Sequence, residues 1–297
     1  MNRIYTRTDL ASECTAKLDR NKSQLQSKDY SLESITEKGF ELSLLKILNT
    51  NGEQVIGKPC GTYVTISIGR IWHATEERFS AGSEMICKYI KQLYREASGK
   101  DEAHNILVAG LGNRYITSDA IGHETLKNVI ITRHLEGLNT TLYNMLGGKS
   151  VSGIAPGVIG QTGIETLELI KGAAKNVKPD LMIVIDALVA RELSNLATTV
   201  QITDTGIAPG SGIGNTRQAI NRHSVGCPVI AIGVPTVVES STMVYDALEK
   251  AGIDNISPSL KAVLENGRGF FVTPKESDTV TVEVSRLIAD AINMLVS

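Results

Sequence analysis

Apolar residues along this chain form short continuous runs, separated by longer stretches in which they repeat with helical spacing. Continuous runs bounded by glycine, proline or polar residues are typical of buried strands. Three stand out: NILVAG at 105–110, LMIVID at 181–186 and CPVIAIGVP at 227–235. We expect each of them to be a strand in the interior of one sheet.

Helical patterns alternate with these runs. Apolar residues from Ile86 to Leu93 repeat at spacings of three and four, which predicts a helix over 82–96. A second helix is predicted from Ser118, and a third from about Glu239 to Gly252, a residue suited to follow a helix end. This alternation predicts an α/β fold, with a mainly parallel sheet and helices on both of its faces.

Four further segments complete the expected fold. Residues 39–69 predict an added hairpin whose turn is Asn51-Gly52, and NVIITRHL at 128–135 predicts another strand. The glycine-rich residues 137–163 predict a long loop, while DALVAREL at 186–193 is interpreted as the start of a helix after LMIVID. No linker divides the chain.

Composition excludes several classes of protein. The 297 residues carry a formal net charge of −2, without the basic surplus that is typical of nucleic-acid binders. No apolar run approaches the roughly 20 residues of a membrane span, and the N-terminus does not resemble a secretory signal. The cysteines and histidines show no metal-binding spacing. We therefore expect a cytoplasmic protein without a cofactor, a bound metal, a nucleic-acid partner or a membrane partner.

Carboxylates at the predicted strand ends are the main candidates for chemistry. Asp119 lies a few residues beyond one strand, Asp186 ends another, and Asp204 follows a short apolar run. Sites in such sheets lie at the carboxyl ends of the strands. If Asp119 and Asp186 meet there, they share a proton, so that one activates water while the other protonates a leaving nitrogen. All three aspartates also have a purely structural interpretation: Asp119 and Asp186 could cap helices, and Asp204 could be a turn residue.

Neighbouring residues extend this hypothesis and leave alternatives open. Backbone amides of Gly112 and Asn113 are candidates to stabilise an oxyanion, and His123 either bonds to the carboxylate pair or faces solvent. A metal-assisted peptidase using the two aspartates and a histidine is one alternative. A nucleotide-binding regulatory protein is another, although Tyr115 stands where the third glycine of the fingerprint belongs.

Five stretches from Leu111 onward together resemble the spore germination proteases of endospore-forming bacteria: LGNRYITSDAIG, GQTGIETLELI, LMIVIDALVAREL, TTVQITDTGIAPGSGIGN and GFFVTPKESD. The resemblance implies an endopeptidase of the developing spore core that degrades small acid-soluble spore proteins when germination begins. It also implies a zymogen, a homotetramer and a core similar to that of hydrogenase-maturation proteases. The two aspartates essential to this family match Asp119 and Asp186, whereas the family's prolines are replaced by Ser118 and His123.

Given this resemblance, the segment TDLASE, residues 8–13, can be interpreted as a cleavage sequence. Substrates of this family are cut within Thr-Glu-apolar-Ala-Ser/Thr-Glu, before the apolar residue, and TDLASE repeats that pattern with Asp for Glu. We predict self-cleavage between Asp9 and Leu10, which makes 1–9 a propeptide and 10–297 the catalytic domain. Because Asp9 adds a third negative charge to the site, we also expect this cleavage to be slow at neutral pH and faster in acid.

Overall fold

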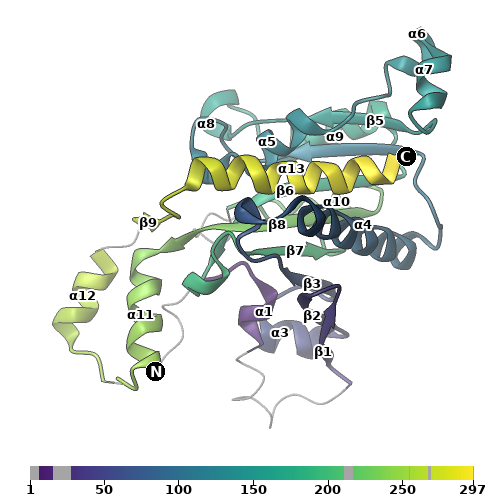
Figure 1. The fold of residues 1–297 in the computed structure, drawn as a ribbon. Helices are drawn as coiled ribbons and strands as arrows, with labels where there is room; N and C mark the ends of the chain where they lie inside the picture. Colours follow the sequence, from purple (N-terminus) through teal and green to yellow (C-terminus); the bar gives the residue numbers. More distant parts are fainter. Residues whose placement is uncertain (1–6, 16–27, 211–216, 254, 267–268, 297) are drawn as a thin grey trace.

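The computed structural model describes residues 7–15, 28–210, 217–253, 255–266 and 269–296. Strands in these ranges form one sheet in the order β1-β2-β3-β7-β8-β6-β4-β5, with β9 paired to the far end of β8 (Figure 1). Helices cover both faces of this sheet. The predicted α/β class is therefore confirmed.

Parallel pairing joins four neighbouring strands in the order β5-β4-β6-β8. Three of them contain the apolar runs predicted to be strands; the bounds are β4 Asn105–Gly110, β5 Ser150–Ile154, β6 Leu181–Ala190 and β8 Val229–Glu239. Almost every residue of β6 and β8 is buried, since helices cover both faces here. This parallel part supports the candidate site.

The rest of the sheet is antiparallel. This antiparallel part is larger than the alternation of strands and helices in the sequence predicts. Its strands are β1 Tyr30–Glu37, β2 Phe40–Ile47, β3 Gly61–Ser67, β7 Thr199–Thr203 and β9 Phe271–Val272. Only residues 191–198 separate β6 from β7, and a parallel crossover needs a dozen or more. The chain therefore returns antiparallel, beside β8.

The predicted hairpin is present, but its predicted turn is wrong. Strands β2 and β3 pair antiparallel over 41–47 and 61–67. Asn51 and Gly52 lie instead inside α3, Thr50–Ile56, which connects the two strands. The Asn49 side chain accepts hydrogen bonds from the Asn51 amide at 3.0 Å and the Gly52 amide at 3.1 Å. This N-cap starts a helix where the dipeptide alone favours a turn.

Three other sequence predictions are also corrected. Residues 186–190 continue β6 rather than starting a helix, because β8 is long enough to pair with them as far as Val238. The segment 129–134 is not a strand, although its Thr132 and Arg133 amides donate to the Val151 carbonyl. The strand beside β4 is β5, which lies within the glycine-rich stretch interpreted as a loop.

Two helical layers enclose the parallel strands. One contains α4 Glu76–Ser98, α5 Ile121–Asn128 and α13 Ser277–Val296, and the other contains α9 Thr166–Val177 and α10 Arg222–Val225 (Figure 1). Each layer packs on its own cluster of buried apolar side chains. The predicted helices at 82–96 and after Ser118 correspond to α4 and α5.

Smaller helices lie at the periphery. They are α1 Ala11–Cys14, α6 Leu135–Leu138, α7 Thr140–Met145, α8 Ile159–Thr162, α11 Ser240–Lys250 and α12 Pro258–Asn266. Short 3₁₀ turns occupy Ile71–His73, Thr117–Asp119 and Leu193–Asn195. The predicted helix from Glu239 to Gly252 is confirmed as α11. Within the described ranges, no helix combines the length and apolarity of a membrane span.

Candidate active site

Asp186 lies where the parallel sheet narrows. Strand β4 ends at Gly110, which pairs with Ile185, so Asp186 is the first β6 residue beyond the end of its neighbour. The residue is 6% exposed, and its Oδ1 accepts a hydrogen bond from the Ala187 amide at 3.0 Å. The structure therefore places this carboxylate at the sheet edge, inside a strand and not at a helix cap.

Asp119 reaches the same edge from the loop after β4. Its Oδ2 accepts a hydrogen bond from the Asn113 amide at 2.8 Å. Gly112 makes this tight loop possible, because its φ is +92° and a Cβ there would lie 1.9 Å from the Asp119 carbonyl oxygen. Only glycine fits such an approach. The Asn113 amide predicted to stabilise an oxyanion therefore holds the Asp119 carboxylate here.

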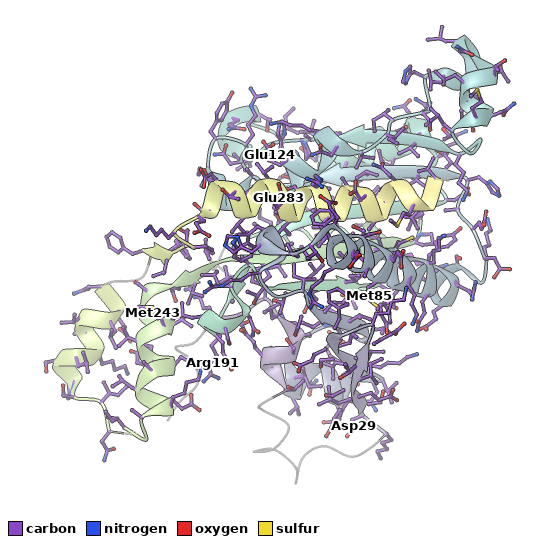
Figure 2. The ribbon with its side chains drawn as sticks, in the orientation of Figure 1. Asp29, Met85, Glu124, Arg191, Met243 and Glu283 are labelled. Carbon is purple, nitrogen blue, oxygen red and sulfur yellow. The ribbon has the colours of Figure 1, made fainter. Side chains whose placement is uncertain are left out.

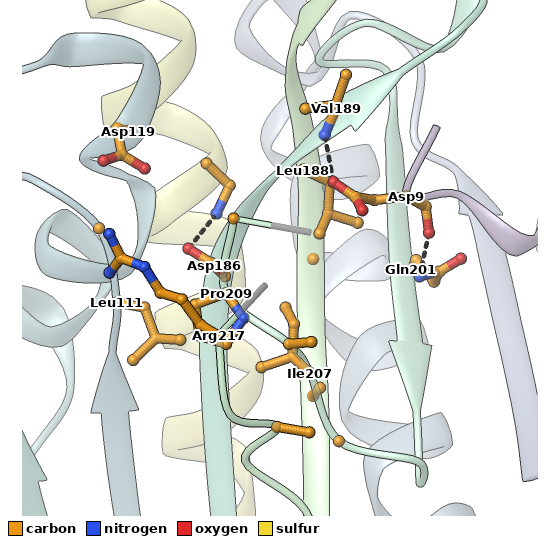
Figure 3. Close-up of a pocket in the computed structure, with 18 of the residues that line it drawn as sticks. Asp9, Leu111, Asp119, Asp186, Leu188, Val189, Gln201, Ile207, Pro209 and Arg217 are labelled. Carbon is orange, nitrogen blue, oxygen red and sulfur yellow. Dashed lines mark hydrogen bonds between the residues drawn. The ribbon is translucent and has the colours of Figure 1, made fainter. Parts of the chain in front are cut away.

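Both aspartates line a cavity of about 560 Å³, together with Gly112 and Arg217 (Figure 3). Burial raises the pKa of Asp119, while the Asn113 amide and Arg217 act in the opposite direction. Burial raises the pKa of Asp186 much further, and the charges of Asp119 and Asp9 add to this effect. Burial and the neighbouring charges therefore favour the protonated form of Asp186 more strongly than that of Asp119.

Two predicted contributors lie elsewhere. Asp204 follows β7, and its Oδ1 accepts a hydrogen bond from the Thr62 amide at 2.8 Å, as expected of a turn residue. His123 is half-buried on α5, where burial and Lys127 lower its pKa. Neither is among the described residues that line the cavity.

The N-terminal segment, residues 7–15, is docked beside the aspartates. Asp9 lines the same cavity, its amide donates to the Val189 carbonyl at 2.8 Å, and its Oδ2 accepts from the Val189 amide at 3.0 Å (Figure 3). Leu10 is fully buried against Leu188, Ala190 and Val238. Leu188 follows Asp186 by two residues, so the two side chains share one face of β6, roughly 7 Å apart along the strand.

Glu13 anchors the other end of this segment. Its carboxylate accepts hydrogen bonds from the Arg191 amide at 2.7 Å, the Glu192 amide at 3.0 Å and the Asn195 side chain at 2.8 Å. Arg191 in turn bonds to α11, beside which it lies in Figure 2. Of the predicted propeptide, residues 1–6 lie outside the described ranges.

Sequence reasoning missed several residues around the site. Arg217 faces the aspartates, while Lys58 and Gln201 contact the docked segment. A lysine before Pro59 and a glutamine in a β-strand carry no motif, so only the pairing of β3 with β7 brings them together. No group of three or more His, Cys, Asp or Glu in the described part of the chain could hold a metal ion.

Comparisons with known proteins agree on one family. A family model described as germination protease matches residues 6–251. The chain is 38% identical to the germination protease of Caldanaerobacter subterraneus subsp. tengcongensis, with 87% of this chain and 85% of that protein covered. It is 34% identical to the germination protease of Clostridium tetani, with 98% and 95% covered. The germination protease of Priestia megaterium is 38% identical, with 84% and 68% covered.

A solved [NiFe] hydrogenase maturation protease, HycI from Thermococcus kodakarensis KOD1, is 17% identical. The match covers 64% of this chain and 93% of that one, with a TM-score of 0.34.

The α/β chain with paired carboxylates in its cavity is thus a peptidase. It belongs to the germination protease family.

Proposed function

We propose that this protein is a self-processing spore germination endopeptidase that hydrolyses peptide bonds with Asp119 and Asp186. One observation carries the proposal: Asp9, which precedes the predicted cleavage point, lines the same cavity as both aspartates. Family membership supports proteolysis during germination. The metal-assisted and nucleotide-binding alternatives gain no support from the described residues.

The two aspartates receive different roles from their surroundings. Asp119 is the general base: burial raises its pKa less than that of Asp186, and the Asn113 amide and Arg217 oppose that rise by favouring the ionised form. Asp186 is the general acid, since burial and the nearby negative charges favour its protonated form. Asp119 removes a proton from the attacking water, and Asp186 delivers its proton to the leaving nitrogen.

The docked segment 8–13 serves in this proposal as an internal copy of the substrate sequence. Cleavage between Asp9 and Leu10 releases residues 1–9 and converts the zymogen to the active chain 10–297. The substrates in trans are small acid-soluble spore proteins in the spore core, and the active form is a homotetramer. Apolar, alanine and acidic positions of the pattern correspond to Leu10, Ala11 and Glu13, all of which are buried in this structure.

Cleavage in trans tests this function. The full chain, preincubated at mildly acid pH, is mixed with a peptide that contains Thr-Glu-Leu-Ala-Ser-Glu, and mass spectrometry locates the cut. We expect a single cut between Glu and Leu, and no cut in a scrambled peptide or by the Asp186→Asn variant. Cutting of the scrambled peptide, or cutting by the variant at the parent rate, would contradict the proposal.

A further inference from the structure

Two side chains converge on the carbonyl oxygen of the bond proposed to be cut. Lys58 Nζ donates to the Asp9 carbonyl oxygen at 2.9 Å and lies 3.5 Å from the Thr8 carbonyl oxygen. Gln201 Nε2 donates to the same Asp9 oxygen at 3.4 Å, a bond drawn in Figure 3. A cation and an amide thus face the one atom on which negative charge develops during hydrolysis.

Both donors are held by elements other than those that position the aspartates. Lys58 lies in the short connection between α3 and β3, and the buried Gln201 lies in the middle of β7. Gln201 also accepts a hydrogen bond from the Ala11 amide at 2.6 Å through its Oε1. The Gln201 side chain therefore binds both the Asp9 carbonyl oxygen and the Ala11 amide. These two hydrogen bonds fix the position of the Asp9 carbonyl relative to Lys58.

Docking of the segment does not depend on Lys58 alone. Asp9 forms two hydrogen bonds with Val189, Leu10 is buried, and Glu13 accepts three hydrogen bonds from residues 191–195. The Lys58 ammonium is directed at backbone oxygens of the segment. This position suits stabilisation of an anion better than recognition of a particular side chain.

We propose that Lys58, assisted by Gln201, forms the oxyanion site of this protease. Resting on the function proposed above, the step begins when the water oxygen bonds to the Asp9 carbonyl carbon and Asp119 accepts the proton. The carbonyl electron pair moves to the oxygen, where Lys58 and Gln201 stabilise the negative charge. The electron pair on that oxygen then re-forms the carbonyl, and the carbon–nitrogen bond breaks as Asp186 protonates the Leu10 nitrogen. The products are a carboxylic acid at the Asp9 carbonyl carbon and a Leu10 amine.

The rate of self-cleavage tests this role. Full-length parent, Lys58→Gln and Lys58→Met are incubated at mildly acid pH, and intact mass follows the first-order loss of residues 1–9. Loss of one oxyanion donor lowers rates by about 10²- to 10³-fold, so we expect a drop of that order in both variants. Lys38→Met is the matched control, because Lys38 is an exposed lysine paired with Glu84; it should cleave at the parent rate.

Hydrogen exchange of residues 7–14 separates catalysis from docking. We expect the Asp9 and Ala11 amides to stay protected in Lys58→Gln while cleavage is lost. If the parent cuts but the Lys58 variants stay within about threefold of its rate, Lys58 has no catalytic role and the proposed function stands. If cleavage and protection are lost together, Lys58 is a docking contact. If the parent does not cut this bond, the proposed function fails and the role of Lys58 fails with it.

Discussion

Single residues determine how the two carboxylates differ. Asp186 is buried within a strand, where burial raises its pKa well above the ordinary value, whereas Asp119 is held by the Asn113 amide in a loop that only Gly112 permits. The chemistry of the pair therefore depends on backbone geometry and burial as much as on the carboxylates themselves.

Gly112→Ala should inactivate the protein. An alanine Cβ would lie 1.9 Å from the Asp119 carbonyl oxygen, so the loop must shift and carry the carboxylate with it. Gly99→Ala is the matched control, because Gly99 also has a positive φ, +71°, but open space around its Cβ. The control should lose about 1–2 kcal/mol of stability and keep cleavage, whereas Gly112→Ala should lose more stability and all cleavage. Urea unfolding measures the stability of each variant, and intact mass measures its self-cleavage. An active Gly112→Ala protein would refute this interpretation of the loop.

Asp186→Asn should stabilise the protein at neutral pH. Burial raises the pKa of Asp186 above its unfolded value, so the folded state binds this proton more tightly. The stabilising effect of that proton is complete below the unfolded pKa and is lost as pH rises through the folded one. Thermal unfolding at several pH values should show that the melting temperature of the variant exceeds that of the parent by a margin that widens as pH rises. An equal gap at every pH would show that Asp186 is not held protonated.

At the level of elements, the docked N-terminal segment is the distinctive feature. Residues 7–15 contact β6, β7 and the connection between α3 and β3, so this segment forms part of the site. Glu13 is its main polar anchor.

Glu13→Ala should loosen this segment. The substitution leaves the partly buried Arg191 and Glu192 amides without their acceptor, and loss of a hydrogen bond to a charged group costs about 1.5–3 kcal/mol. Hydrogen exchange over 7–14 should become faster by the corresponding factor, and self-cleavage should slow. Ser12→Ala is the control and should exchange like the parent. Unchanged exchange in Glu13→Ala would mean that other contacts hold the segment.

Much of the element pattern could be predicted from the sequence. The apolar runs identified β4, β6 and β8, helical spacing identified α4, and the glycine after its end helped to identify α11. The errors came from tertiary context. Asn49 caps a helix where Asn51-Gly52 favours a turn, and pairing with β8 extends β6 through residues with helical composition.

Part of the candidate site could likewise be predicted from the sequence, and part depended on tertiary context. Asp119 and Asp186 could be placed together because parallel strands end at a common edge. Lys58, Gln201 and Arg217 could not, since their positions depend on sheet register and on the fold of distant loops.

For the whole molecule, the proposed loss of residues 1–9 would change the charge of the cavity. Asp9 brings a negative charge close enough to raise the pKa of Asp186. The carboxyl groups of Asp9, Asp119 and Asp186 all line this cavity, together with the cationic Arg217. This arrangement supports the prediction that acid accelerates processing by neutralising one of them.

Asp9→Asn should reduce this dependence on acid. The asparagine oxygen can still accept from the Val189 amide, so docking is kept while the third charge is removed. We expect the ratio of self-cleavage rates between mildly acid and neutral pH to fall towards one. Asp9→Glu, which restores the acid of the substrate pattern, should process faster than the parent. A parent-like acid dependence in Asp9→Asn would contradict the charge explanation.

The most direct measurement is the intact mass of the parent, Asp119→Asn and Asp186→Asn during incubation at mildly acid pH. We predict time-dependent loss of residues 1–9 in the parent and no loss in either variant, with all three proteins folded by thermal unfolding. Cleavage of both variants at the parent rate, or a parent that stays whole, would contradict self-processing by the aspartate pair.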